Sequence, residues 1–212
     1  EYLAQITPWM LRFWRAGWPD RVAAGVKAQA ALMRLARAEM EALVAAAGIA
    51  SLVRSDGVLE LYESEAELRR AQPEIDAKTR EGIEIRIVRG ADLAALQPGL
   101  DPRFVAATFI PKWQTVSDPY EFALAIGKAA TARGVAFRQA EVKALRPLGQ
   151  GAALDFADGT SLTAGKVVVA CGAWSRRLTA PLGDLIPLDT ERGYNTTLPP
   201  GAFDLRRQLV FP

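Results

Sequence analysis

The feature that most restricts the fold is a run of three strand patterns ahead of a valine-rich segment, within residues 135–174. Asp118 followed by Pro119 predicts a helix start before this run. Turn signals at Gly149–Gln150–Gly151 and Asp158–Gly159 separate the strand patterns and predict an antiparallel meander. The apolar run KVVVACGAW that follows is typical of a strand buried on both faces. This order predicts a mixed α/β (α+β) protein.

The apolar run ends in four small residues, Ala170, Cys171, Gly172 and Ala173, and the large side chain of Trp174 follows them. A strand that only fills a core would keep its side-chain volume, whereas small residues let a flat molecule approach the main chain. We therefore expect a cofactor at this position. Since no basic residue and no second cysteine accompanies Cys171, we expect that side chain to be a small buried filler rather than a redox thiol.

The N-terminal part of the chain has helical patterns. Residues 1–18 interleave tryptophans and other apolar side chains with Arg12 and Arg15. We expect an amphipathic segment that packs on the protein's own core, and an interfacial helix on a membrane is the alternative. The alanine- and leucine-rich residues 20–47 predict a long helix that ends at Gly48.

Residues 49–112 predict a unit that mixes strands and helices. The turn Ser55–Asp56–Gly57 between two apolar runs predicts a hairpin. Ser64 followed by Glu67 predicts a helix start, and we expect Pro73 to interrupt or end that helix.

Composition excludes several classes of function. The chain has 212 residues, and its 26 basic and 24 acidic residues leave a net charge of only +2, which argues against a nucleic-acid partner. It has no histidine, which excludes serine–histidine and cysteine–histidine hydrolases and histidine-rich zinc sites, so no metal is expected. The single cysteine suits a reducing, cytoplasmic compartment, and the chain has no apolar run long enough to span a membrane.

Two further motifs bear on binding chemistry. Gly149–Gln150–Gly151 lacks a third glycine and a following helix, so it predicts a turn and not a dinucleotide-binding loop. Arg192 and Tyr194 lie in the motif ERGY. They either belong to a surface strand that leads into a loop or bind an anionic substrate, because a guanidinium grips a carboxylate with two hydrogen bonds and a tyrosine adds a hydroxyl donor.

Four parts of the sequence carry a resemblance to a known family. In chain order they are TVSDPYEFALAIGKAATARGVAF, the meander, KVVVACGAWSRRLTAPLGDLIPLDTERGY and LP. Together they resemble the FAD-dependent D-amino-acid oxidase superfamily, most closely its bacterial D-amino-acid dehydrogenases. The resemblance implies FAD as the cofactor, with Ala170–Cys171–Gly172–Ala173 beside it and Val142 against the adenine through its main chain. It implies Arg192 and Tyr194 as substrate-binding residues and identifies no catalytic residue. Asn195 stands where close dehydrogenases commonly have histidine, so no role is assigned to it.

The resemblance also implies an activity. Such an enzyme oxidises a D-amino acid to an imino acid, and then a keto acid, by hydride transfer to flavin, with electrons passing to a quinone-type acceptor at the inner membrane. Family members begin with a glycine-rich βαβ unit and continue beyond the ERGY motif, so we expect this chain to be an internal fragment. The alternatives are a non-catalytic interaction module and an oxidase of glycine- or sarcosine-like amines.

The expected domain organisation follows the same resemblance: a partial FAD-binding domain with the meander, and a substrate-type domain built on a mixed sheet. The expected ranges are a helical segment over residues 1–48, the substrate-type domain over 49–112 and 182–212, and the partial FAD-binding domain over 113–181.

Overall fold

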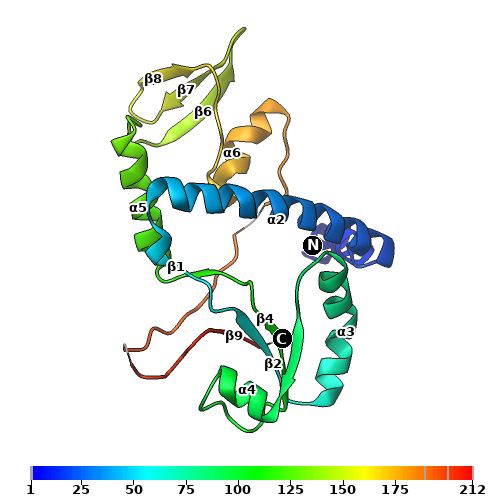
Figure 1. Cartoon of the computed structure of the whole chain (residues 1–212). Coiled ribbons are helices and arrows are strands. Elements are labelled where there is room, and N and C mark those ends of the chain that lie inside the picture. Colours follow the sequence, from blue (N-terminus) through cyan, green and yellow to red (C-terminus); the bar gives the residue numbers. More distant parts are fainter. Residues whose placement is uncertain (1, 189, 200, 212) are drawn as a thin grey trace. The chain divides into compact units, whose positions relative to one another are not determined.

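The structure is a computed structural model that describes residues 2–188, 190–199 and 201–211. It forms two compact units, Glu1–Gly134 with Pro200–Pro212 as the first and Val135–Pro199 as the second. Figure 1 shows the elements of both units and confirms the expected mixed α/β class. The regular elements of the first unit are α1 (Tyr2–Ala16), α2 (Pro19–Ala47), β1 (Val53–Arg54), β2 (Val58–Tyr62), α3 (Glu65–Arg80), β3 (Arg86–Arg89), α4 (Gly90–Leu96), β4 (Ala106–Ile110), β5 (Thr115–Val116), α5 (Pro119–Ala132) and β9 (Gln208–Val210).

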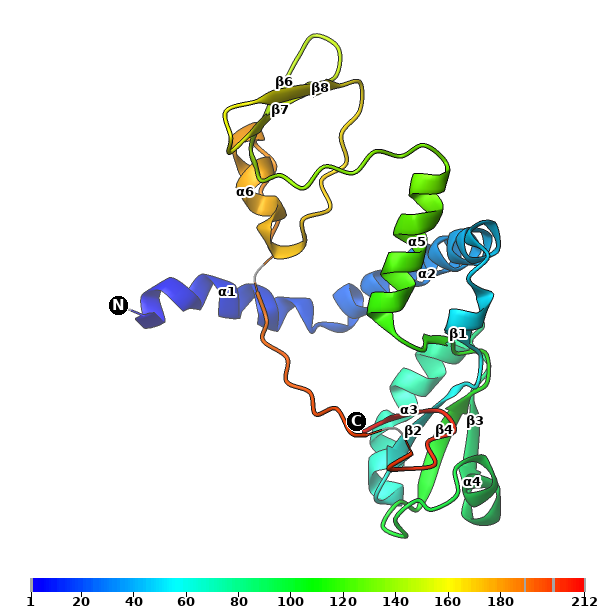
Figure 2. The same cartoon turned by 90° about the vertical axis from the view of Figure 1, so that its left-hand side faces the viewer.

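A four-stranded mixed sheet in the order β3-β4-β2-β9 forms the centre of the first unit. β4 runs antiparallel to β2 and β3, while β9 runs parallel to β2. Leu93 of α4 packs with Leu59 on one face of this sheet, and Leu68 of α3 packs with Tyr62 on the other. Both helices lie beside the sheet in Figure 2. Helices on both faces explain why all five residues of β4 are buried and apolar or small.

The local helix signals in the sequence are confirmed. The Ser64 hydroxyl accepts a hydrogen bond from the Glu67 amide at 3.2 Å, at the start of α3. The Asp118 carboxylate accepts one from the Tyr120 amide at 2.7 Å, at the start of α5. Gly48 adopts a left-handed conformation with φ +69° and ends α2. Each signal acts within one turn of helix, so it does not depend on the rest of the fold.

The hairpin predicted at Ser55–Asp56–Gly57 is wrong. β1 pairs with β5, and β2 pairs with β4 and β9, so the strands on the two sides of the turn belong to different sheets. Gly57 is still required because it has φ +77° and a Cβ there would lie 2.6 Å from the ring of Phe109.

The expectation that Pro73 interrupts or ends a helix is also wrong, because α3 continues through it to Arg80. Leu68 and Ile75, one on each side of the proline, are both buried against the sheet. Their packing offsets the missing amide hydrogen bond.

The aromatic side chains of α1 do not pack on a core within the described part of the chain, which corrects the expectation for residues 1–18. Trp9, Phe13 and Trp14 are 58%, 67% and 65% exposed. The guanidinium of Arg15 forms two hydrogen bonds with the Asp20 carboxylate, at 2.9 and 2.8 Å. No helix among the described residues is both long enough and apolar enough to cross a membrane.

The predicted meander is confirmed in the second unit. β6 (Val142–Pro147), β7 (Ala152–Phe156) and β8 (Ser161–Ala164) form an antiparallel sheet in that order. Gly151, in the turn between β6 and β7, has φ +79°, and a Cβ there would collide with the carbonyl of Ala164. The short helix α6 (Ser175–Thr179) follows the meander and contacts β6.

Candidate functional site

The valine-rich segment before the small residues does not form the predicted buried strand, and residues 166–170 have no regular secondary structure. Val167 and Val169 are half-buried, and Val168 between them is 88% exposed. This alternation is that of an extended chain with one covered face. A strand buried on both faces needs neighbours on both edges, and within the described residues no strand pairs with this segment. The prediction fails for that reason.

The small residues form an open turn. Gly172 has φ +56° and begins a single 3₁₀ turn, and a Cβ added there would meet no atom within 4 Å. The amide of Cys171 donates a hydrogen bond to the hydroxyl of Ser175 at 3.2 Å, which anchors the turn to α6. Side-chain crowding at Gly172 would have argued against a cofactor, and the structure shows none there.

Cys171 is an exposed free thiol, so the prediction that it is a small buried filler is wrong. That prediction assumed that Cys171 ends a buried strand. The structure has an open turn at this position instead, and the side chain of Cys171 is therefore exposed.

Val142 is the first residue of β6, where it is half-buried and pairs with Phe156 of the neighbouring strand. A register shift follows between Val142 and Ala144. Since α6 contacts β6, the helix that follows the small residues lies against the strand that Val142 begins.

A hollow of about 460 Å³ lies beside the valine-rich segment in the second unit. Val167 and Val169 line it together with Leu145 of β6 and Thr179 of α6. The hydroxyl oxygen of Thr179 is buried without a hydrogen-bond partner in the described part of the chain. The sequence analysis missed Thr179, because a threonine at the end of a short helix carries no distinguishing pattern.

Arg192 and Tyr194 lie in an irregular stretch, and the structure does not bring them into this hollow. Both side chains are exposed, Tyr194 by 88%. They share one extended segment, and described residues 184–188 and 190–199 contain no helix or strand.

An ion pair across the meander holds β6 and β7 together. Two guanidinium nitrogens of Arg146 lie 2.6 and 2.8 Å from the carboxylate oxygens of Asp155, and the Ser161 hydroxyl donates to the same carboxylate at 2.7 Å. The Arg146 guanidinium, followed by the Ser161 hydroxyl, holds the pKa of Asp155 well below its usual range. This pair adds to the main-chain pairing of β6 with β7, and β6 carries Leu145, which lines the hollow.

The residues present fit part of an FAD site. The main chain at Gly172 is open to a large ligand, and, among the described residues, the hydroxyl of Thr179 is unpaired in the hollow, which residues 170–173 do not line. The chain has no Gly-x-Gly-x-x-Gly run, so it lacks the loop that cradles a dinucleotide diphosphate. The open turn thus suits contact with FAD, whereas the printed sequence contains no glycine-rich loop of the kind that binds its diphosphate.

Comparison with known proteins gives a consistent assignment. A family model described as DAO, FAD dependent oxidoreductase, matches residues 4–212. A D-amino acid dehydrogenase of Xylella fastidiosa (strain M12) is 32% identical over 195 residues, which cover 90% of this chain and 45% of that protein. A D-amino-acid oxidase of Bradyrhizobium diazoefficiens is 26% identical, with coverage of 93% and 47%.

A solved structure agrees. Glycine oxidase from Geobacillus kaustophilus superposes with a TM-score of 0.59 at 27% identity, covering 79% of this chain and 44% of that one. The chain thus spans about half the length of the curated relatives it matches. The resemblance drawn from the sequence is confirmed.

Proposed function

This chain belongs to the DAO family of FAD dependent oxidoreductases, and from that membership we propose that it is part of an enzyme that oxidises D-amino acids. The observation that carries the proposal is the 32% identity, over 90% of the chain, to a protein named D-amino acid dehydrogenase. The products are an imino acid and two reducing equivalents, and water then converts the imino acid into a keto acid and ammonia.

The small residues of the second unit are the proposed cofactor contact. When bound, FAD supplies the acceptor for the hydride on the substrate α-carbon. Ala170, Cys171, Gly172 and Ala173 leave the main chain open for approach, and the free space around Gly172 supports this role. The main chain of Val142 is proposed to lie against the adenine.

Arg192 and Tyr194 are the proposed substrate-binding residues. A guanidinium binds a carboxylate with two parallel hydrogen bonds, and a phenol adds one donor. Both side chains are exposed in this chain and so are accessible to a ligand. The D-amino-acid carboxylate is the group we propose they hold.

The expected domain ranges stand as part of the same proposal. Residues 113–181 would belong to the FAD-binding domain. Residues 49–112 and 182–212 would belong to the substrate-type domain, and residues 1–48 would form a helical segment.

The proposed enzyme is cytoplasmic and passes its electrons to a quinone-type acceptor. It is also proposed to make a peripheral contact with the inner membrane. The exposed aromatic side chains of α1 support the contact, since Trp9, Phe13 and Trp14 suit the headgroup region of a bilayer. Arg12 lies on the same helix, which has no acidic residue.

Oxidation of glycine or a related small amine is the second candidate function. The 27% identity to glycine oxidase over 79% of the chain favours it. This candidate shares the cofactor and differs in substrate and acceptor.

The test is anaerobic reduction of the flavin in the protein that contains this chain. We expect D-alanine to bleach the visible flavin absorption and L-alanine to leave it unchanged. Faster bleaching by glycine or sarcosine would favour the second candidate, and bleaching by the L-enantiomer alone would contradict the proposal. Reoxidation by a soluble quinone should outpace reoxidation by oxygen.

A further inference from the structure

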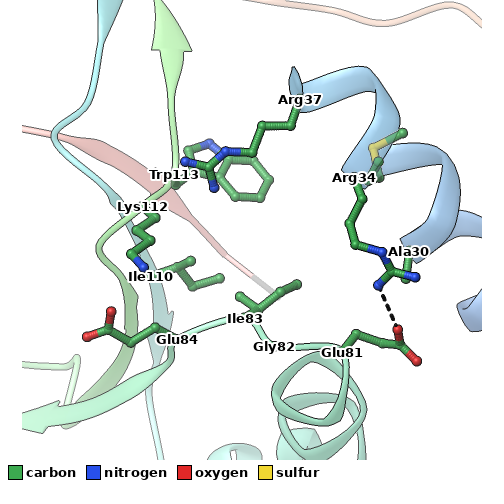
Figure 3. Close-up of a pocket in the computed structure, with 11 residues that line it drawn as sticks. Ala30, Arg34, Arg37, Glu81, Gly82, Ile83, Glu84, Ile110, Lys112 and Trp113 are labelled. Atoms are coloured by element: carbon green, nitrogen blue, oxygen red, sulfur yellow. Dashed lines mark hydrogen bonds and ion pairs between the residues drawn. The ribbon is translucent and has the colours of Figure 1, made fainter. Parts of the chain in front are cut away.

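A pocket of about 280 Å³ lies in the first unit, between α2 and the segments that follow α3 and β4. Figure 3 shows Arg34 and Arg37 reaching from α2, Lys112 and Trp113 following β4, and Ile83 following α3. Its volume is near the lower end of ligand pockets, about 300–1,000 Å³. It shares no residue with the proposed cofactor and substrate positions, so an inference from it does not depend on the proposed function.

The acidic residues of the pocket are already neutralised. Glu81 pairs with Arg34 at 3.1 Å. Glu84 accepts a hydrogen bond from Nε of Arg86 at 3.0 Å, and Arg86, followed by the more distant Lys112, lowers the pKa of Glu84. Neither carboxylate is left to attract a cation into the pocket.

One cation of the pocket remains available. Arg37 pairs with Glu41 at 2.9 Å, one turn along α2. Lys112 is exposed, and within the described residues its ammonium group has no hydrogen bond and no ion pair. The ammonium group of Lys112 interacts with the Glu84 carboxylate only at longer range, so its hydrogen-bond donors are free for an anion.

The remaining lining is apolar. Ile110 is 4% exposed at the base, while Ile83 and Met33 are partly open to the pocket. The indole nitrogen of Trp113 donates to the side-chain oxygen of Gln208 at 3.0 Å, which restrains the ring. A flat apolar body would cover these surfaces and remove them from water.

We propose that this pocket binds a small monocarboxylate with a flat apolar body, the carboxylate on Lys112 and the body against Ile83 and Trp113. A phosphate group fits less well, because it carries nearly two charges and is best held by several free donors. A cation is disfavoured by three basic lining residues against two acidic ones.

The test is calorimetric titration of the protein that contains this chain with 2-naphthoate, alongside its neutral analogue 2-naphthamide. We expect saturable binding of naphthoate that weakens with added salt, and binding of naphthamide weaker by at least tenfold. Equal affinity for the two probes, or no saturable binding of naphthoate, would overturn the proposal. This comparison uses only the unaltered protein, so it does not depend on any variant folding.

Variants locate the site. Lys112→Met should weaken naphthoate binding at least tenfold and leave naphthamide unchanged, while Ile83→Ser should weaken both probes. Lys128→Met is the matched control, since Lys128 is an exposed lysine on α5 outside the pocket. If Lys112→Met binds naphthoate as tightly as the control, the proposal is wrong. Flavin binding has no part in this readout, so failure here leaves the proposed function untouched.

Discussion

The buried side chain of Gln97 donates a hydrogen bond to the main-chain carbonyl of Asp204, with 2.7 Å between nitrogen and oxygen. Its own oxygen accepts a hydrogen bond from the amide of Arg206 at 3.0 Å. Gln97 is 4% exposed and directly follows α4. One side chain thus ties residues 204–206 to the core, immediately before β9 pairs with β2.

Gln97→Leu should detach that segment. Leucine is similar in size but leaves the partly buried carbonyl of Asp204 and amide of Arg206 unpaired, at a cost of about 1–3 kcal/mol. Urea unfolding should show this loss. Gln29→Leu, at an exposed glutamine of α2, is the control and should change stability by less than about 0.5 kcal/mol. Equal effects of the two variants would show that the amide does not hold β9.

Gly151→Ala should destabilise the second unit. The left-handed backbone alone costs a residue with a Cβ about 1–3 kcal/mol, and collision with the Ala164 carbonyl adds to that. Gly149→Ala is the matched control in the same turn, since a Cβ there meets nothing within 4 Å. Thermal unfolding should separate the variants by several degrees, and indistinguishable midpoints would contradict the turn geometry.

Asp155 should make the meander sensitive to acid. Its pKa is lowered in the folded state, mainly by Arg146, so its contribution is present above the unfolded pKa of about 4 and is lost as the pH falls further. Asp155→Asn should therefore lower the urea midpoint relative to the wild-type protein at pH ~7 and much less at pH ~3.

Arg146→Gln provides the complementary measurement. Without the guanidinium, the effect of Asp155→Asn should shrink at neutral pH, because the largest cause of the shift is gone. An Asp155→Asn effect of the same size at both pH values would argue against the ion pair.

The aromatic side chains of α1 should support membrane attachment. Trp9→Ser together with Trp14→Ser should reduce co-sedimentation of the protein with anionic lipid vesicles several-fold, because apolar burial drives interfacial binding. Both side chains are more than half exposed, so the fold should be unaffected. Tyr120→Ser, at a 69% exposed aromatic residue of α5, is the control. Unchanged co-sedimentation of the double variant would remove the membrane proposal.

Signals that act over one turn of chain were predictable from sequence. The caps at Ser64 and Asp118 and the stop at Gly48 involve only near neighbours. The predicted hairpin failed because β2 finds its partners β4 and β9 far along the chain. Pairing of that kind is decided by the whole sheet, and a local turn signal such as Ser55–Asp56–Gly57 does not predict it.

The candidate site was predictable only in part. The small residues at Gly172 were recognised from the loss of bulk, and the structure gives them an open turn. The exposure of Val168 and Cys171 was not predictable, because a run of valines does not indicate whether other strands pair with it. Arg192 and Tyr194 remain predictions, since the structure leaves them on an exposed segment.

The most direct test of the account is FAD retention by the protein that contains this chain, with Ala170→Phe as the variant. Ala170 is exposed here, so the larger ring should leave the unfolding midpoint unchanged while it fills the space proposed for the cofactor. Ala202→Phe, at an exposed alanine in the first unit, is the control. We predict that the wild-type protein and the control retain FAD and that Ala170→Phe binds it at least tenfold more weakly. A wild-type protein that takes up no FAD, or an Ala170→Phe variant that binds it as tightly as the control, would contradict the proposed role of the small residues.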